Sequence, residues 1–119
     1  MIDLDSFTGA HLCGGFLLNG ITVSAQPMLD PIGRPALART VIIAAELEIE
    51  LQPGMSDEEV SISIYHEVLE AAAVAAAHPP VAVMEMNEAD FESVARRMHA
   101  TLGQATPESL NRMLEMHGF

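Results

Sequence analysis

One stretch of the chain, residues 56–80, constrains the fold more than any other. It opens with Ser56-Asp57-Glu58-Glu59, in which the serine can cap a helix and the glutamate three residues later completes a capping box. It closes at His78-Pro79-Pro80, because a proline disfavours helical backbone in the residue before it. Between these signals lies a broad apolar surface formed by Val60, Ile64, Val68, Leu69 and the alanines at 71–73 and 75–77. We therefore predict a central, largely buried helix from about residue 57 to about residue 77.

The residues before this helix predict a small sheet. Phe16-Leu17-Leu18 and residues 21–25 flank Asn19-Gly20, a dipeptide that tolerates the positive φ angles of a tight type I′ turn, so we expect a hairpin. Arg39 to Leu51 predicts one strand, because apolar residues at 47, 49 and 51 alternate with glutamates at 46, 48 and 50. Three prolines and a glycine make residues 27–37 a predicted loop. The first dozen residues are expected to be rich in turns.

Two further helices are predicted after residue 80. Asn87 is a candidate N-cap for a helix that runs to about Leu102, and Thr106-Pro107-Glu108 begins a last helix with proline at its first position. A chain of 119 residues, half of them hydrophobic, has the length for one core, so we expect a single domain over residues 1–119. The expected fold class is α+β: a small twisted antiparallel or mixed sheet of about three strands, packed on the central helix, with two further C-terminal helices.

Charge and cysteine content exclude several classes of function. Five Lys and Arg against 17 Asp and Glu give a formal net charge of −12, which repels phosphate backbones, so nucleic acid is not an expected partner. Cys13 is the only cysteine, which rules out an intrachain disulfide and a four-thiolate zinc site and fits a reducing compartment. The acidic N-terminus does not resemble a secretory signal, and no apolar run approaches the roughly 18 to 20 residues of a membrane span. We expect a soluble, cytoplasmic protein that has no membrane partner.

The central helix carries the residues best suited to chemistry. His66 and Glu70 are four residues apart and therefore lie on one helix face, within reach of a common ion, with Glu67 one step around the helix. In zinc-protease helices, a histidine and a second ligand at this spacing hold Zn²⁺, and a glutamate next to the histidine accepts a proton from water that the metal activates. This spacing favours a metal site with an adjacent general base.

The stretch from Ile64 to Ala71, with His66-Glu67-Val68-Leu69-Glu70 at its centre, resembles the small zincin-like metallopeptidases of bacteria and phages. The resemblance covers roughly residues 38–102 and includes the Arg-led strand, the short turn and the capping box. It implies a zincin-like fold and a zinc-dependent metallopeptidase, with one zinc ion held by His66 and Glu70 and with Glu67 as general base. Such proteins commonly carry His-Glu-x-x-His. The acid at position 70 favours harder cations and weakens the Lewis acidity of zinc.

The same resemblance implies a third metal ligand downstream of the metal-site helix. Glu88, the acid that opens the next helix, is the predicted ligand, and Asp90 and Glu85 are the alternatives. Acids are also favoured in a first helical turn by the helix macrodipole, so Glu88 has a structural explanation as well. His78 lies more than three turns beyond the motif on a different rotation, and His99 is expected to cap or pack, so neither is a predicted ligand.

Three functions stay open on the sequence alone. The first is a metal-dependent, peptidase-like hydrolase whose peptide or protein substrate adds as a strand to a sheet edge beside the central helix. The second is a catalytically inactive zincin-like domain that acts in partner binding or dimerisation, because uncovered apolar helix surface would suit a homodimer. The third is a regulator that binds a metal ion without hydrolysis.

Overall fold

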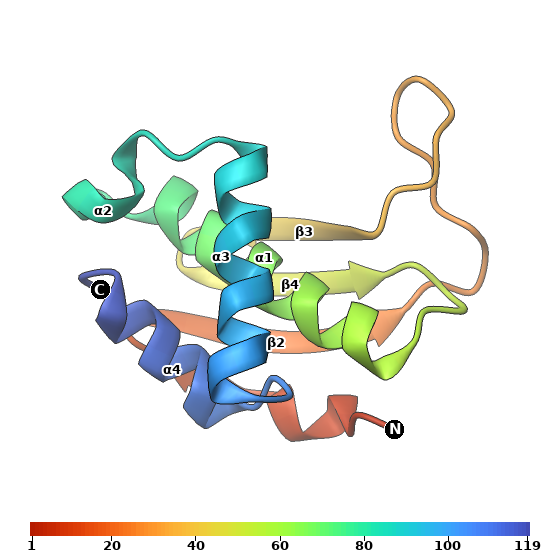
Figure 1. Ribbon diagram of the computed structural model, residues 1–119, viewed down its shortest axis with the longest axis horizontal. Helices are drawn as coiled ribbons and strands as arrows, with labels where there is room; N and C mark the ends of the chain where they lie inside the picture. The colour runs from red at the N-terminus through yellow and green to blue at the C-terminus, as the bar shows by residue number, and fades with distance from the viewer.

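The computed structural model describes all 119 residues and shows an α+β fold built on a four-stranded mixed sheet (Figure 1). The strands are β1 (Ala10–Leu12), β2 (Phe16–Val23), β3 (Ala38–Ile43) and β4 (Glu46–Leu51). They lie in the order β1-β2-β4-β3, and only the central pair, β2 and β4, is parallel. The α+β class and the mixed sheet are as predicted, but the sheet has four strands instead of about three.

The hairpin predicted around Asn19-Gly20 is wrong. Both residues lie inside β2, where the pairing with β4 shifts register between Leu18 and Gly20 and forms a bulge. The strand stays continuous because its pairing with β4 runs through this region to Val23, whereas β1 pairs only with Phe16, Leu17 and Leu18. The real N-terminal hairpin joins β1 to β2 through Gly14 and Gly15, whose φ angles are 87° and 84°. The entry predicted to be only turn-rich thus contains a short 3₁₀ helix (Leu4–Phe7) and a strand.

The segment from Arg39 to Leu51, predicted as one strand, is two antiparallel strands, β3 and β4. They are joined by a tight turn at Ala44-Ala45, in which Ala44 adopts a φ of 55°. The predicted alternation holds within β4: Leu47, Ile49 and Leu51 are at most 2% exposed. Their glutamate neighbours face away from the core, so the sheet has one apolar face and one polar face.

The three long helices lie on the apolar side of the sheet, with α1 between the sheet and α3, whereas α2 lies beyond one end of the sheet (Figure 1). The helices are α1 (Asp57–Ala75), the short α2 (Val81–Met84), α3 (Glu88–Leu102) and α4 (Pro107–Met116). The three long helices were predicted, and each begins with a capping box, at Ser56, Asn87 and Thr106 respectively. None of the helices combines the length and apolar character needed to cross a lipid bilayer.

Helix α1 is the centre of the hydrophobic core. Its residues Tyr65, Val68 and Leu69 are fully buried and belong to a cluster of 25 buried apolar residues that also draws on the sheet, α3 and α4. His66, Glu67 and Glu70 are only half-buried, because they lie on the side of α1 that faces the free edge of β3 and the start of α3. The packing that buries the rest of α1 therefore fixes these three polar side chains at an open edge of the core.

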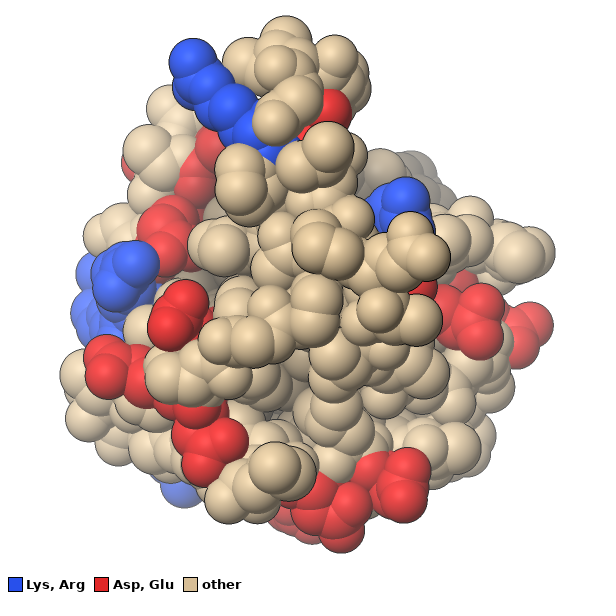
Figure 2. Space-filling model, turned by 90° about the vertical axis from the view of Figure 1, so that its right-hand side faces the viewer, with Lys and Arg blue, Asp and Glu red and all other residues tan.

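Residues 27–37 form a loop, as predicted, interrupted by one isolated bridge between Leu29 and Pro35. This loop forms the right-hand edge of the molecule in Figure 1 and therefore lies on the face shown in Figure 2. On that face, acidic side chains lie around a largely uncharged centre and outnumber the basic ones. The loop ends at Leu37, which brings the chain to the beginning of β3 and to the site described next.

Candidate metal centre

Three side chains of α1 converge at its open edge, as the helical spacing predicts. Each of His66, Glu67 and Glu70 offers a ligand atom, and these atoms all lie within 4.8 Å of one another. The regular α-helix from Asp57 to Ala75 produces this arrangement, because residues one and four positions apart project from neighbouring points of its surface. The sequence prediction that these three residues form one group agrees with the geometry.

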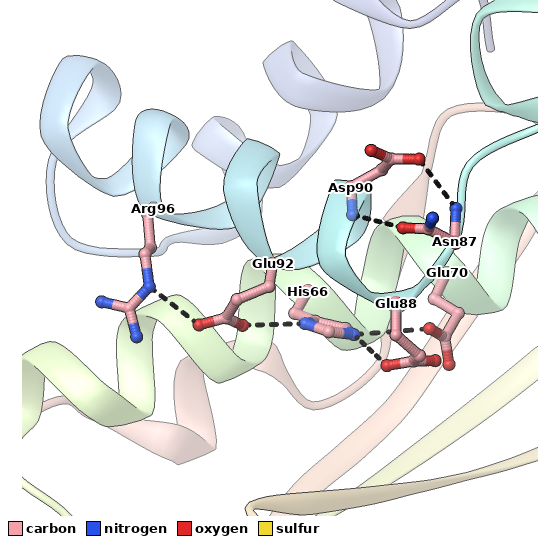
Figure 3. A network of polar contacts seen from close by, with 7 residues as sticks. All are labelled: His66, Glu70, Asn87, Glu88, Asp90, Glu92 and Arg96. Atoms are coloured by element: carbon pink, nitrogen blue, oxygen red, sulfur yellow. Dashed lines mark hydrogen bonds and ion pairs between the residues drawn. The ribbon is translucent and has the colours of Figure 1, made fainter.

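Glu88 of α3 completes the group around the imidazole of His66 (Figure 3). The Nε2 atom of His66 lies 3.3 Å from Glu70 Oε2 and 3.1 Å from Glu88 Oε2. The carboxylate of Glu88 reaches this position from the first turn of α3, where Asn87 caps the helix. One histidine nitrogen thus faces two carboxylate oxygens that come from different helices.

The donor atoms fit a divalent cation in both chemistry and spacing. One imidazole and two carboxylates are ligand types that Zn²⁺ accepts in proteins. Two ligand atoms on a tetrahedral zinc ion, with bonds of about 2.0–2.1 Å, stand about 3.3 Å apart. The two separations from His66 Nε2 are close to that spacing.

The cluster lines an open cavity of about 360 Å³ between α1, α3 and the beginning of β3. Leu37 and Ala38 form the β3 side of this cavity, and Ser63, His66, Glu67 and Glu70 come from α1. Because β3 is the outer strand of the sheet, its free edge borders the cavity. A molecule in the cavity could therefore contact the polar cluster and the unpaired backbone of β3 together.

Burial and nearby charges act in opposite directions on His66. Burial lowers the pKa of this imidazole, but the bond to Glu92 and the charges of the three other glutamates outweigh it, so the pKa lies above its usual value. For Glu67, burial is the main effect and raises the pKa of the carboxyl, while the charge of His66 lowers it in part. A carboxyl with a raised pKa is suited to accept a proton near neutral pH.

Glu70 and Glu88 behave as a pair that shares a proton. Burial, together with the hydrogen bond to Glu88 and the charge of Glu88, raises the pKa of Glu70 to about 7. The pKa of Glu88 is lowered, first because Glu70 donates a hydrogen bond to it and then because His66 lies beside it. In the metal-free protein, Glu70 is therefore the carboxyl that holds a proton at pH values below about 7, and a cation bound by both carboxylates would displace that proton.

The other candidate ligands lie elsewhere. Asp90 accepts a hydrogen bond from the Asn87 backbone at 3.0 Å and points away from His66 (Figure 3), so it completes the helix cap. Glu85 ends the short helix α2 and is exposed outside the cavity. The Nδ1 atom of His99 lies 2.8 Å from Ser61 Oγ, which makes it a packing residue, and His78 is exposed after α1. None of these four side chains joins the His66 group.

Three residues of the site were missed by the sequence reasoning. Glu92 contacts His66 Nδ1 at 3.0 Å, and Arg96 contacts Glu92 at 2.9 Å. Thr40 of β3 lies beside Glu67 and slightly lowers its pKa, although its buried hydroxyl makes no hydrogen bond of full geometry. The sequence contained one usable signal: Glu88, Glu92 and Arg96 are spaced four apart and so share one row of α3.

Comparison of the chain with family models, with curated proteins and with solved structures gave no match. Any function for this chain must therefore be argued from the chemistry of its own residues.

Proposed function

We propose that this chain is a zinc-dependent, peptidase-like hydrolase of minimal zincin-like type. The observation that carries the proposal is the position of His66 Nε2, which faces Glu70 Oε2 at 3.3 Å and Glu88 Oε2 at 3.1 Å. The next residue, Glu67, projects into the same cavity. His66, Glu70 and Glu88 would hold the ion, and Glu67 would be the general base.

The residues divide the proposed chemistry among them. A zinc ion at this site would supply Lewis acidity, which activates water and polarises a carbonyl near neutral pH. Glu67 accepts a proton from the attacking water on its carboxylate and returns it to the leaving amine. Burial raises the pKa of the Glu67 carboxyl, and the side chain lines the cavity beside His66. The proposed general base, Glu67, is therefore a residue whose environment suits proton transfer.

The edge of β3 is the proposed place for an extended peptide substrate. This strand pairs with β4 on one side only, and its first residue, Ala38, lines the cavity together with His66 and Glu67. A peptide added along this edge would gain backbone hydrogen bonds and lie next to the polar cluster. The cavity is open and is lined only by α1, α3 and the beginning of β3, so we expect recognition of a particular protein or peptide segment.

The test combines metal content with cleavage. Protein purified without an affinity tag or chelator is analysed by elemental mass spectrometry and then assayed, with zinc, on a library of fluorogenic peptides. The proposal predicts close to one zinc ion per chain and cleavage that Glu67→Gln abolishes while zinc content is kept. Failure of the wild-type chain to take up zinc would contradict it.

The alternative function is partner binding or dimerisation by a catalytically inactive domain. It is favoured by apolar side chains at one end of the fold: Val74, Val81 and Met84 are 71%, 87% and 63% exposed. Such exposed apolar groups are common at protein–protein contacts. Zinc binding without any Glu67-dependent cleavage, together with a concentration-dependent increase in mass by ultracentrifugation, would support this alternative.

A further inference from the structure

We infer that Glu92 is a positioning residue of the metal centre and that Arg96 holds it in place. The two ring nitrogens of His66 have different neighbours, because Nε2 faces Glu70 and Glu88 whereas Nδ1 lies 3.0 Å from Glu92 Oε1 (Figure 3). The inference rests on the metal site proposed above, but it does not depend on hydrolysis.

Contacts on both oxygens fix the carboxylate of Glu92. While Oε1 contacts His66, Oε2 lies 2.9 Å from the Nε atom of Arg96, one turn further along α3. A carboxylate bonded through both oxygens cannot rotate without losing one of its partners. The Glu92 carboxylate is thus held on the Nδ1 side of the His66 ring, opposite to the side on which Glu70 and Glu88 lie.

The contact with Glu92 selects the tautomer that can bind a metal ion. An ionised carboxylate only accepts hydrogen bonds, so Nδ1 of His66 must carry the proton in this contact. In the neutral ring, Nε2 then has a free lone pair, and this atom faces the two proposed carboxylate ligands. Histidine ligands in metal sites commonly donate their second ring N–H to a carboxylate in this way, which orients the ring and raises its basicity.

Packing adds to this orientation. The side chain of His66 is only 15% exposed, and its ring lies 6.2 Å, centre to centre, from the ring of Phe91. Phe91 is the neighbour of Glu92 on α3 and is itself buried. The same helix therefore supplies a proposed ligand at Glu88, the apolar wall at Phe91 and the positioning contact at Glu92.

The experiment measures zinc affinity by competition with a chromophoric chelator. Loss of a carboxylate that accepts the other ring N–H of a histidine ligand typically costs about 10- to 100-fold in metal affinity, and we expect Glu92→Gln to weaken zinc binding by that factor. Arg96→Met removes only the group that holds Glu92, so we expect a smaller loss of about 3- to 10-fold. Arg96 is exposed and does not touch His66, so this variant tests the inference even if Glu92→Gln folds poorly.

Two control variants separate positioning from a general change in charge. Arg97→Met removes a cation from the next residue of α3, and Glu58→Gln removes an exposed acid from the first turn of α1. Neither side chain takes part in an ion pair or a side-chain hydrogen bond, so both variants should bind zinc within about twofold of wild type. Equal losses in Arg96→Met and Arg97→Met would overturn the inference.

A spectroscopic measurement distinguishes positioning from structural support. The visible absorption spectrum of the Co²⁺-loaded protein reports the ligand geometry and should change in Glu92→Gln but not in Arg97→Met. A purely structural role would lower the stability of the metal-free protein in urea without changing zinc affinity or this spectrum, and that result would overturn the inference.

If wild type binds zinc through His66 and Glu92→Gln binds it equally well, the inference about Glu92 fails while the proposed metal site stands. If wild type binds no zinc, the proposed metal site fails first and the inference fails with it.

Discussion

Two histidines at the contact between α1 and α3 have opposite surroundings. His99 of α3 contacts Ser61 of α1 at 2.8 Å, and the buried Ser61 hydroxyl also accepts a hydrogen bond from the backbone N–H of Ala105. His66 of α1 contacts the carboxylates of Glu70, Glu88 and Glu92. The first cluster is closed and uncharged except for the histidine itself, whereas the second is open and rich in negative charge.

The difference between the two clusters lies in the balance of donors and acceptors. In the cluster at Ser61, the buried hydroxyl has two partners, the backbone N–H of Ala105 and Nδ1 of His99, and such hydrogen-bonded burial is what a polar group needs in order to stabilise a fold. The cluster at His66 sets one ring, with at most two N–H groups, against three carboxylates. A cation would restore that balance. An excess of acceptors, and not the presence of a histidine, distinguishes the proposed metal cluster from the cluster at Ser61.

Replacement of each histidine by alanine should give the largest contrast. His66→Ala removes a proposed ligand and should weaken zinc binding by more than about 100-fold, since loss of a residue that only orients a ligand already costs about 10- to 100-fold. His99→Ala should leave zinc affinity within about twofold and lower the free energy of unfolding by about 1 kcal/mol, the worth of an ordinary hydrogen bond. Isothermal titration and urea denaturation measure the two effects. A similar loss of zinc affinity in both variants would show that the comparison is wrong.

The closed cluster should respond to Ser61→Ala with a loss of stability alone. This change leaves the buried N–H of Ala105 without an acceptor, which costs about 1–3 kcal/mol. Urea denaturation of the metal-free protein measures the loss, with Ser93→Ala on the exposed side of α3 as the control. Zinc affinity measured on the same samples should not change. A marked decrease in zinc affinity for Ser61→Ala would mean that the two clusters are not independent.

Zinc binding at the His66 cluster should reverse the way in which the free energy of unfolding changes with pH. In the metal-free protein, the pKa of Glu70 is raised to about 7 and that of His66 is also raised. The folded state therefore binds more protons than the unfolded state, and its stability should fall as pH rises from about 5 to about 7. With zinc present, those protons must leave for the ion to bind, so stability should rise with pH instead. Thermal melts at a series of pH values, with and without zinc, test the reversal, and parallel profiles would contradict it.

The smallest predicted effect concerns the β3–β4 turn, which is remote from the closed cluster. Ala44 has a φ of 55°, a left-handed conformation that glycine adopts without steric cost. We expect Ala44→Gly to raise the free energy of unfolding by about 0.5–1 kcal/mol, because relief of this strain exceeds the added entropy of the unfolded chain. Ala45→Gly, in the same turn but without a positive φ, should stabilise less or destabilise. Equal effects in both variants would show that Ala44 is not strained.

The helices could be predicted because their ends carry local chemical signals. The capping boxes at Ser56 and Asn87 and the proline after Thr106 depend only on residues within one turn, and the structure has a helix at each. The grouping of His66, Glu67 and Glu70 followed from the same helix geometry. For these features, local sequence was sufficient.

The sheet could not be predicted in the same way. Asn19-Gly20 favours a turn in isolation, but pairing of β2 with β4 before and after the dipeptide keeps the chain extended and makes the dipeptide part of a bulge. The turn at Ala44-Ala45 has none of the residues that usually mark one and forms because β3 and β4 pair across it. In both places tertiary pairing overrides local preference.

Glu92 was missed for a similar reason. It lies 26 residues from His66 in the sequence, and only the packing of α3 on α1 brings the two side chains to 3.0 Å. Glu88 was predicted because it is the acid that opens α3. Its side chain does contact the same ring, at 3.1 Å from Nε2. Motif spacing can therefore find residues on one helix, whereas the partners that orient them depend on the packing of a second helix.

The most direct test of the metal centre is anomalous diffraction at the zinc absorption edge from crystals grown with zinc. The account predicts one strong anomalous peak per chain at about 2.0–2.2 Å from His66 Nε2 and from a carboxylate oxygen of each of Glu70 and Glu88. Glu92 should still contact Nδ1 on the opposite side of the ring. The account would be contradicted by no peak at His66 in zinc-containing crystals, or by an ion held only by exposed acids elsewhere on the surface.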